Sequence, residues 1–207
     1  DMDADIIEKA KEIKRSFRLM MDGVTSQSMR DKGANYHVNW GASIPMLKAK
    51  AKEMGNNHDL AVELWKDNVR ECKILALMTM PADEMSRQLA ELWMEQINNT
   101  ELAELASMYL FCKLPYAPDM AYKWMASENE LQQICGFHIL ARLFMNGQEP
   151  NERGINEYID QAQAAIMGGS MNVRKAAMAS MRRFADLALV YERLADTAMK
   201  RCGIDFF

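Results

Sequence analysis

Residues 60–77 read LAVELWKDNVRECKILAL, and this stretch decides the fold class. Apolar residues recur every three or four positions on both sides of a short polar break at residues 66–68. Such spacing is typical of amphipathic helices, because one face of an α-helix repeats every 3.6 residues. One helix pair cannot bury its own apolar face, so it needs further pairs stacked against it. The stretch therefore predicts a helical hairpin that packs against other helices.

The rest of the chain shows the same periodicity. Ser43 can cap a helix whose first turn holds Pro45 and which stops at Gly55, and Asn57 or Asp59 can cap the next. Asp83 is expected to start another helix. No segment alternates with a period of two. The sequence predicts an all-α protein of roughly a dozen helices, over residues 6–21, 43–55, 60–65, 69–77, 83–97, 100–110, 121–125, 131–144, 155–167, 173–185 and 187–200.

The helices are also related to one another. Residues 120–133 follow the plan of residues 60–72, which is a helix with one indole, a polar break and a more apolar helix. Successive second helices start about 30–42 residues apart, a period typical of HEAT or armadillo repeats. We expect one domain over residues 1–207, a right-handed HEAT-like α-solenoid of antiparallel helix pairs. It would comprise an N-terminal helix (1–25), an irregular segment (26–42) that forms a loop or a short, irregular helix, and stacked pairs (43–201).

Composition supports this fold class. Of the 207 residues, 49% are apolar and 26% are charged, which is ordinary for a globular protein. Only ten glycines and five prolines are present, too few for a β-sandwich or barrel that turns every ten residues. The nineteen methionines suit helices and adaptable cores.

Charge and cysteine content limit the function. Twenty-nine acidic residues against twenty-five Lys and Arg give a net charge of −4, so no global positive field attracts nucleic acid or acidic lipid. Cys72, Cys112, Cys135 and Cys202 are far apart in sequence and read as reduced thiols. We expect no cofactor, no metal, no membrane span and a cytoplasmic location.

Three stretches carry a family resemblance. Residues 39–53 (NWGASIPMLKAKAKE), Leu64-Trp65 and residues 70–76 (RECKILA) resemble the AlkD-like DNA alkylation repair family of HEAT-like repeat DNA glycosylases. The similarity extends over residues 36–186 at helix spacing. It implies double-stranded DNA as the partner, held on a basic concave face, and excision of N3- and N7-alkylated purines. A carboxylate would stabilise the oxocarbenium charge that develops on the deoxyribose.

The resemblance also assigns site residues. The family's Trp-Asp-x-x-Asp motif falls on residues 100–104, so that Thr100 replaces an indole and Glu104 replaces the catalytic Asp. A framing Arg falls on Gln133, and a second Trp falls on Ala179. Of these four positions, only the one at Glu104 keeps the family's type of side chain, a carboxylate. The resemblance therefore implies a glycosylase whose activity is weakened, altered or lost, because rates depend on placement to within an ångström.

Local charge points to a different part of the chain. Residues 81–130 hold nine acids and three bases, whereas residues 170–201 hold seven bases and three acids. Within the second range we expect phosphate contacts at a basic group, made of Arg174, Lys175, Arg182 and Arg183. Trp40, beside Tyr36 and His37 in the irregular segment, is a further candidate contact to nucleic acid.

Structural interpretations stand beside these assignments. A helical glutamate such as Glu104 is commonly a solvated surface residue, and Arg70 with Glu71 reads as a structural ion pair between adjacent helices. Trp65, Trp93 and Trp124 occupy apolar helical positions and are expected in the core.

Two functional hypotheses follow. The first is a DNA alkylation repair protein that binds duplex DNA, and is located at the nucleoid if it does so. The second is a non-catalytic scaffold that binds a protein or an unusual nucleic-acid structure. A monomer is expected in either case.

Overall fold

The computed structural model describes residues 2–206, with no side-chain description for Met2. These residues form twelve α-helices and no strand, as the sequence predicts. One isolated parallel bridge joins Val38 to Val69. Three short 3-10 turns are η1 (Phe17–Leu19), η2 (Ala82–Glu84) and η3 (Phe111–Lys113). The α-helices are α1 (Met2–Ser16), α2 (Gly23–Asp31), α3 (Ile44–Met54), α4 (His58–Trp65), α5 (Arg70–Thr79), α6 (Arg87–Gln96), α7 (Thr100–Tyr109), α8 (Ala117–Met125), α9 (Glu130–Met145), α10 (Glu152–Gly168), α11 (Met171–Ala185) and α12 (Leu189–Arg201).

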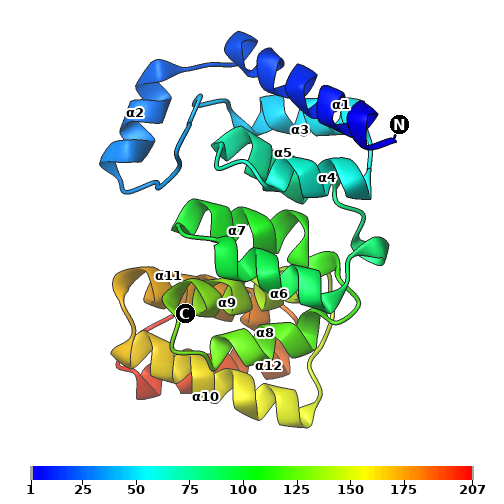
Figure 1. Cartoon of the computed structure of the whole chain (residues 1–207). Helices are drawn as coiled ribbons and strands as arrows, with labels where there is room; N and C mark the ends of the chain where they lie inside the picture. Colours follow the sequence, from blue (N-terminus) through cyan, green and yellow to red (C-terminus); the bar gives the residue numbers. More distant parts are fainter. Residues whose placement is uncertain (1, 207) are drawn as a thin grey trace. The chain divides into compact units, whose positions relative to one another are not determined.

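The chain divides into two compact units. Unit 1 extends to Leu110 and holds α1 to α7, and unit 2 begins at Phe111 and holds α8 to α12. In Figure 1 the colours of the helices run from blue to green through unit 1 and from green to red through unit 2. The expectation of a single domain stays a prediction.

Several helix ends lie where the sequence predicted them. The Ser43 hydroxyl accepts a hydrogen bond from the Met46 N–H, and Gly55 ends α3 with a φ of 70°. The Asn57 carboxamide oxygen caps α4 by accepting from the Leu60 N–H at 3.0 Å. These residues satisfy backbone groups that a helix terminus leaves without partners.

Three expected boundaries differ from the structure. The N-terminal helix expected over residues 1–25 ends at Ser16, and α2 is a separate helix that starts at Gly23. Residues 26–42 are not irregular throughout, because α2 extends to Asp31 and is capped by the Asp22 carboxylate, which accepts from the Thr25 N–H. The helix expected to start at Asp83 starts at Arg87 instead, capped by the Ser86 hydroxyl. Asp83 lies in the 3-10 turn η2, directly after Pro81. The side chains of Asp22 and Ser86 cap α2 and α6 and so set where these two helices start.

A stacked indole pair lies in the core of unit 1. The Trp65 and Trp93 rings are 4.3 Å apart between centroids and 7° from parallel, and Trp65 Nε1 donates to the Gln96 side chain at 2.7 Å. The Lys73 ammonium lies 4.2 Å from the Trp65 ring centroid and donates to the Trp65 carbonyl. Burial lowers the pKa of Lys73. The predicted core positions of Trp65 and Trp93 are confirmed.

Unit 2 is built around α9, which packs against α8 and α11. At Gly136 a methyl group would lie 2.7 Å from the Ala121 carbonyl, so glycine permits the close approach of α8. Trp124 is buried as predicted and meets Phe111 edge to face. The Tyr158 hydroxyl is buried and donates to Ser180 at 2.8 Å. This hydrogen bond gives the buried hydroxyl a partner and joins α10 to α11.

Candidate functional site

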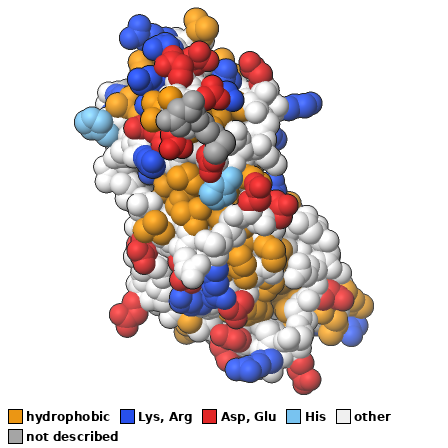
Figure 2. All heavy atoms as spheres, turned by 45° about the vertical axis from the view of Figure 1, so that its right-hand side comes forward, with side chains coloured by type: hydrophobic (Ala, Val, Ile, Leu, Met, Phe, Trp, Pro, Cys, Tyr) orange, Lys and Arg blue, Asp and Glu red, His pale blue; other side chains and the backbone are white. Residues whose placement is uncertain are grey.

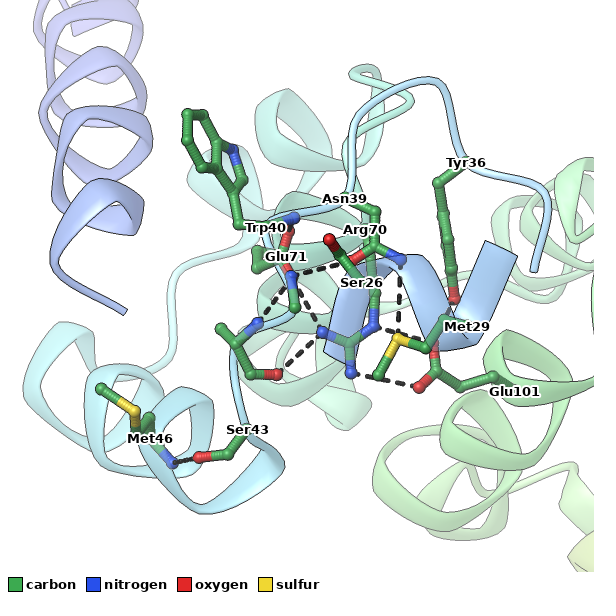
Figure 3. Close-up of polar contacts among 12 residues, drawn as sticks. Ser26, Met29, Tyr36, Asn39, Trp40, Ser43, Met46, Arg70, Glu71 and Glu101 are labelled. Atoms are coloured by element: carbon green, nitrogen blue, oxygen red, sulfur yellow. Dashed lines mark hydrogen bonds and ion pairs between the residues drawn. The ribbon is translucent and has the colours of Figure 1, made fainter. Parts of the chain in front are cut away.

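Arg70 and Glu71, in the first turn of α5, organise the loop before α3. The side chains are 1% and 0% exposed. The Arg70 guanidinium donates at 2.8 Å to both the Glu71 carboxylate and the Ala42 carbonyl. The Glu71 carboxylate in turn accepts from the backbone N–H groups of Trp40 and Ala42, at 3.0 and 3.3 Å. Two of the sequence stretches that carry the family resemblance are therefore joined by a buried clamp (Figure 3).

Glu101 extends this clamp to α7. Its carboxylate accepts from Arg70 Nε at 2.9 Å and from an Arg70 terminal nitrogen at 3.1 Å. The Tyr36 hydroxyl donates to Glu101 at 2.7 Å and lies 3.2 Å from the Asn99 carboxamide oxygen. The predicted structural ion pair is confirmed, with Glu101 as the partner on the second helix. We call Tyr36, Arg70, Glu71 and Glu101 the buried network.

Burial and charge shift the pKa values of Arg70 and Tyr36 in this network. Burial lowers the pKa of the Arg70 guanidinium, but the hydrogen bonds and charges of Glu101 and Glu71 outweigh it and raise that pKa overall. Burial and the Glu101 carboxylate also raise the pKa of the Tyr36 phenol, which keeps it a hydrogen-bond donor. With one guanidinium against two carboxylates, the network carries a net negative charge, and its acceptors outnumber its donors.

Gly41 fixes α2 against the same loop. Its φ is 70°, and a methyl group there would lie 2.2 Å from the Asp22 carbonyl and 2.9 Å from the Ser26 nitrogen. The Asp22 N–H donates to the Trp40 carbonyl at 2.8 Å. Only glycine tolerates both the left-handed backbone and this close approach. The N-terminus of α2 is therefore held directly beside the buried network.

These elements line an open hollow of about 390 Å³ within unit 1. Arg70 and Glu101 are among its lining residues, and the Glu101 side chain is 29% exposed. Its walls are mainly apolar and include four methionines. We call it the methionine hollow, lined by Leu19, Met20, Met21, Asp22, Thr25, Met29, Gly41, Ala42, Ser43, Ile44, Met46, Arg70 and Glu101.

The site residues expected in unit 1 lie around this region. Glu104 is exposed on α7, one turn after Glu101, and is not among the described residues that line the hollow. Thr100 is half-buried in the first turn of α7. The Trp40 indole is half-buried and points away from Arg70 and Glu71 (Figure 3). Only the backbone N–H of Trp40 takes part in the clamp, by donating to the Glu71 carboxylate.

The remaining expected residues lie in unit 2. Arg174, Lys175, Arg182 and Arg183 are all exposed on α11, and we call them the basic face of α11. The Arg182 guanidinium lies 4.2 Å from the centroid of the Phe206 ring. The half-buried Gln133 side chain donates to the Ser127 carbonyl, which stabilises the turn between α8 and α9. Ala179 is exposed on α11.

Surface charge is mixed. Figure 2 shows one face of the molecule, on which basic and acidic side chains lie interspersed. Within residues 2–206, no group of three or more His, Cys, Asp or Glu side chains is placed to hold a metal ion. No helix in this range has the length and apolarity needed to span a bilayer.

Sequence reasoning missed Glu101 as a candidate and missed the methionine hollow. Glu101 is separated from Arg70 by 31 positions, so helical periodicity gives no sign of their contact. One signal was available: an Arg-Glu pair inside a strongly apolar helix requires partners, because buried charges must be paired.

The sequence and the fold of the chain are similar to those of known proteins. A family model described as DNA alkylation repair enzyme matches residues 8–185. One solved structure matches with a TM-score of 0.85 and 20% identity, over 94% of this chain and 83% of that chain. It belongs to a new family of proteins related to the HEAT-like repeat DNA glycosylases with affinity for branched DNA structures. This likeness confirms the predicted HEAT-like all-α fold. No curated protein matches the chain.

Proposed function

Because the chain belongs to the DNA alkylation repair enzyme family, we propose that it is a DNA-binding protein that prefers branched DNA to an unbroken duplex. The observation that carries the proposal is the basic face of α11, whose four side chains are all exposed. It lies in residues 170–201, which hold a net charge of +4 in a chain of net charge −4. Exposed Lys and Arg side chains on one helix suit contacts to phosphates.

The preference for branched DNA has separate support. The structurally similar protein comes from a family with affinity for branched DNA. In addition, the positions that correspond to the glycosylase family's framing residues are Thr100, Gln133 and Ala179 here. Gln133 uses its amide to stabilise a turn of its own unit. Binding a DNA shape does not require the sub-ångström framing that base excision requires.

Salt-dependent binding tests this proposal. Affinities for a three-way junction and a linear duplex of equal length would be measured by gel shift from 50 to 200 mM salt. We expect tighter binding to the junction, with log affinity falling by about 0.9 per contacted phosphate for each unit of log salt. Lys175→Gln with Arg183→Gln should reduce that slope by about 2. Arg182 is kept because it contacts Phe206.

The matched control removes two exposed lysines of unit 1, Lys11→Gln with Lys52→Gln, and changes the net charge equally. It should leave the slope unchanged. A junction affinity that does not vary with salt would remove DNA as the partner.

Base excision is the second candidate, favoured by the exposed carboxylate of Glu104 on α7. Release of N7-methylguanine or N3-methyladenine from duplex DNA would be compared for wild type and Glu104→Gln. If wild type releases the base and Glu104→Gln does not, the result would support weakened glycosylase activity that depends on the Glu104 carboxylate. Release no faster than that from the DNA alone would leave only binding.

A further inference from the structure

The walls of the methionine hollow are suited to a flat apolar group. Leu19 is 88% exposed, Met21 61% and Met46 43%, and all three lie at its edge. Exposed apolar side chains that gather around a cavity mark binding sites. Methionine is flexible and polarisable, and its sulfur makes favourable contacts with aromatic rings. The volume of about 390 Å³ lies within the usual range for small-ligand pockets.

The carboxylate of Glu101 determines which polar group fits. Among the described residues, Oε1 accepts from Arg70 Nε and from the Tyr36 hydroxyl, whereas Oε2 accepts from one Arg70 nitrogen. Each carboxylate oxygen can accept about two hydrogen bonds. Oε2 therefore retains capacity for one further donor, and the side chain is 29% exposed beside the hollow.

The charge of the hollow excludes a phosphate. Arg70 is already paired with two carboxylates, and the Asp22 carboxylate adds a further negative charge. A second anion would meet repulsion without a cation to offset it. The complementary ligand is aromatic, uncharged or cationic, and carries an N–H donor.

The site is also held in place before any ligand arrives. The Asn99 cap fixes the start of α7, and Arg70 with Tyr36 fixes the Glu101 side chain. Gly41 holds α2 against the opposite wall. A preformed site loses little entropy when it binds its ligand.

We propose that the methionine hollow binds a single unpaired nucleobase of branched DNA, with the base between methionine side chains and its exocyclic amine donating to Glu101. This inference rests on the proposed function. Unpaired bases at a branch point are already partly unstacked, so the cost of placing one in a pocket is low. Adenine offers an N6 amino donor, whereas the N3–H donor of an unpaired thymine lies between two carbonyl acceptors, O2 and O4, which a carboxylate repels. The hollow should therefore prefer adenine to thymine.

Four three-way junctions test this inference: one fully paired, and three with an unpaired adenine, thymine or abasic nucleotide at the branch. Dissociation constants would be measured by fluorescence anisotropy at fixed salt. We expect wild type to bind the adenine junction about tenfold more tightly than the thymine or abasic junction, the effect of one hydrogen bond to a charged group. Met21→Ala with Met46→Ala should abolish the preference and preserve binding to the paired junction.

The control is Met167→Ala with Met171→Ala, which removes two exposed methionines of unit 2 and should keep the preference. Glu101→Gln, with its fold checked by circular dichroism, replaces one acceptor by a donor and should reduce the preference for adenine over thymine.

Three results would overturn the inference. Equal wild-type affinity for the adenine, thymine and abasic junctions would reject the hollow as a base site, while retained junction binding would leave the proposed function intact. Absence of binding to every junction would reject both. The third result concerns the oligomeric state. If wild type has the mass of two chains in solution, and Met21→Ala with Met46→Ala yields single chains without changing the base preference, the hollow binds a second copy of the chain.

Discussion

Arginine plays opposite parts in the two units. In unit 1, Arg70 is 1% exposed and its guanidinium donates to Glu71, Glu101 and the Ala42 carbonyl. In unit 2, Arg183 is exposed on α11 and forms part of the basic face. Both are conspicuous in the sequence, yet only burial separates an arginine that organises the fold from one suited to phosphate. Replacing an arginine by methionine in each unit, and measuring the change in the free energy of unfolding, tests this comparison.

The largest effect is expected from Arg70→Met. The substitution would leave the carboxylates of Glu71 and Glu101 without their cation, and breaking a buried ion pair in this way costs about 3–5 kcal/mol. Urea unfolding of the purified protein would measure the change in the free energy of unfolding. A loss below about 1 kcal/mol would mean that the network does not stabilise unit 1.

A smaller effect is expected from Gly41→Ala. The new methyl group would meet the Asp22 carbonyl at 2.2 Å, on a backbone whose φ is 70°. Strain of this kind costs about 1–3 kcal/mol. Urea unfolding would again measure it, with Gly33→Ala as the matched control. Gly33 also has a positive φ, of 88°, but the space around its Cβ position is open. Equal losses at both glycines would show that contact with α2 contributes nothing.

Tyr36→Phe should cost about 1 kcal/mol, because it removes one hydroxyl that donates within the buried network. Thermal unfolding followed by circular dichroism would detect this change. A loss comparable to that of Arg70→Met would indicate that the phenol, and not the guanidinium, holds Glu101.

The smallest effect on stability is expected from Arg183→Met. An exposed side chain away from caps and cores changes the free energy of unfolding by less than about 0.5 kcal/mol. The same substitution should weaken DNA binding at low salt, which a gel shift would show. A large loss of stability would place Arg183 among the structural arginines and remove the contrast between the units.

The sequence allowed the helices to be predicted better than the contacts. Ser43, Gly55 and Asn57 were found as caps because capping depends on neighbours three residues apart. Glu101 was missed because its importance comes from Tyr36 and Arg70, 65 and 31 positions away. Local patterns specify helix ends, whereas long-range partners depend on how the helices pack.

The family motifs illustrate the same point. Residues 39–53 and 70–76 carried the resemblance, and the structure shows that residues from both form the clamp around Ala42. Their recurrence in a family can thus follow from the need to build the loop before α3. Motif residues of this kind identify a fold, while the chemistry of a member depends on the side chains that remain exposed.

The stacked indoles in unit 1 have an optical consequence. Rings stacked 4.3 Å apart interact electronically, so the near-ultraviolet spectrum of Trp65 and Trp93 should change when the stack is lost on unfolding. Trp124 in unit 2 meets a phenylalanine instead and contributes no such signal. The melting of unit 1 can thus be followed spectroscopically without any label, in the presence of unit 2.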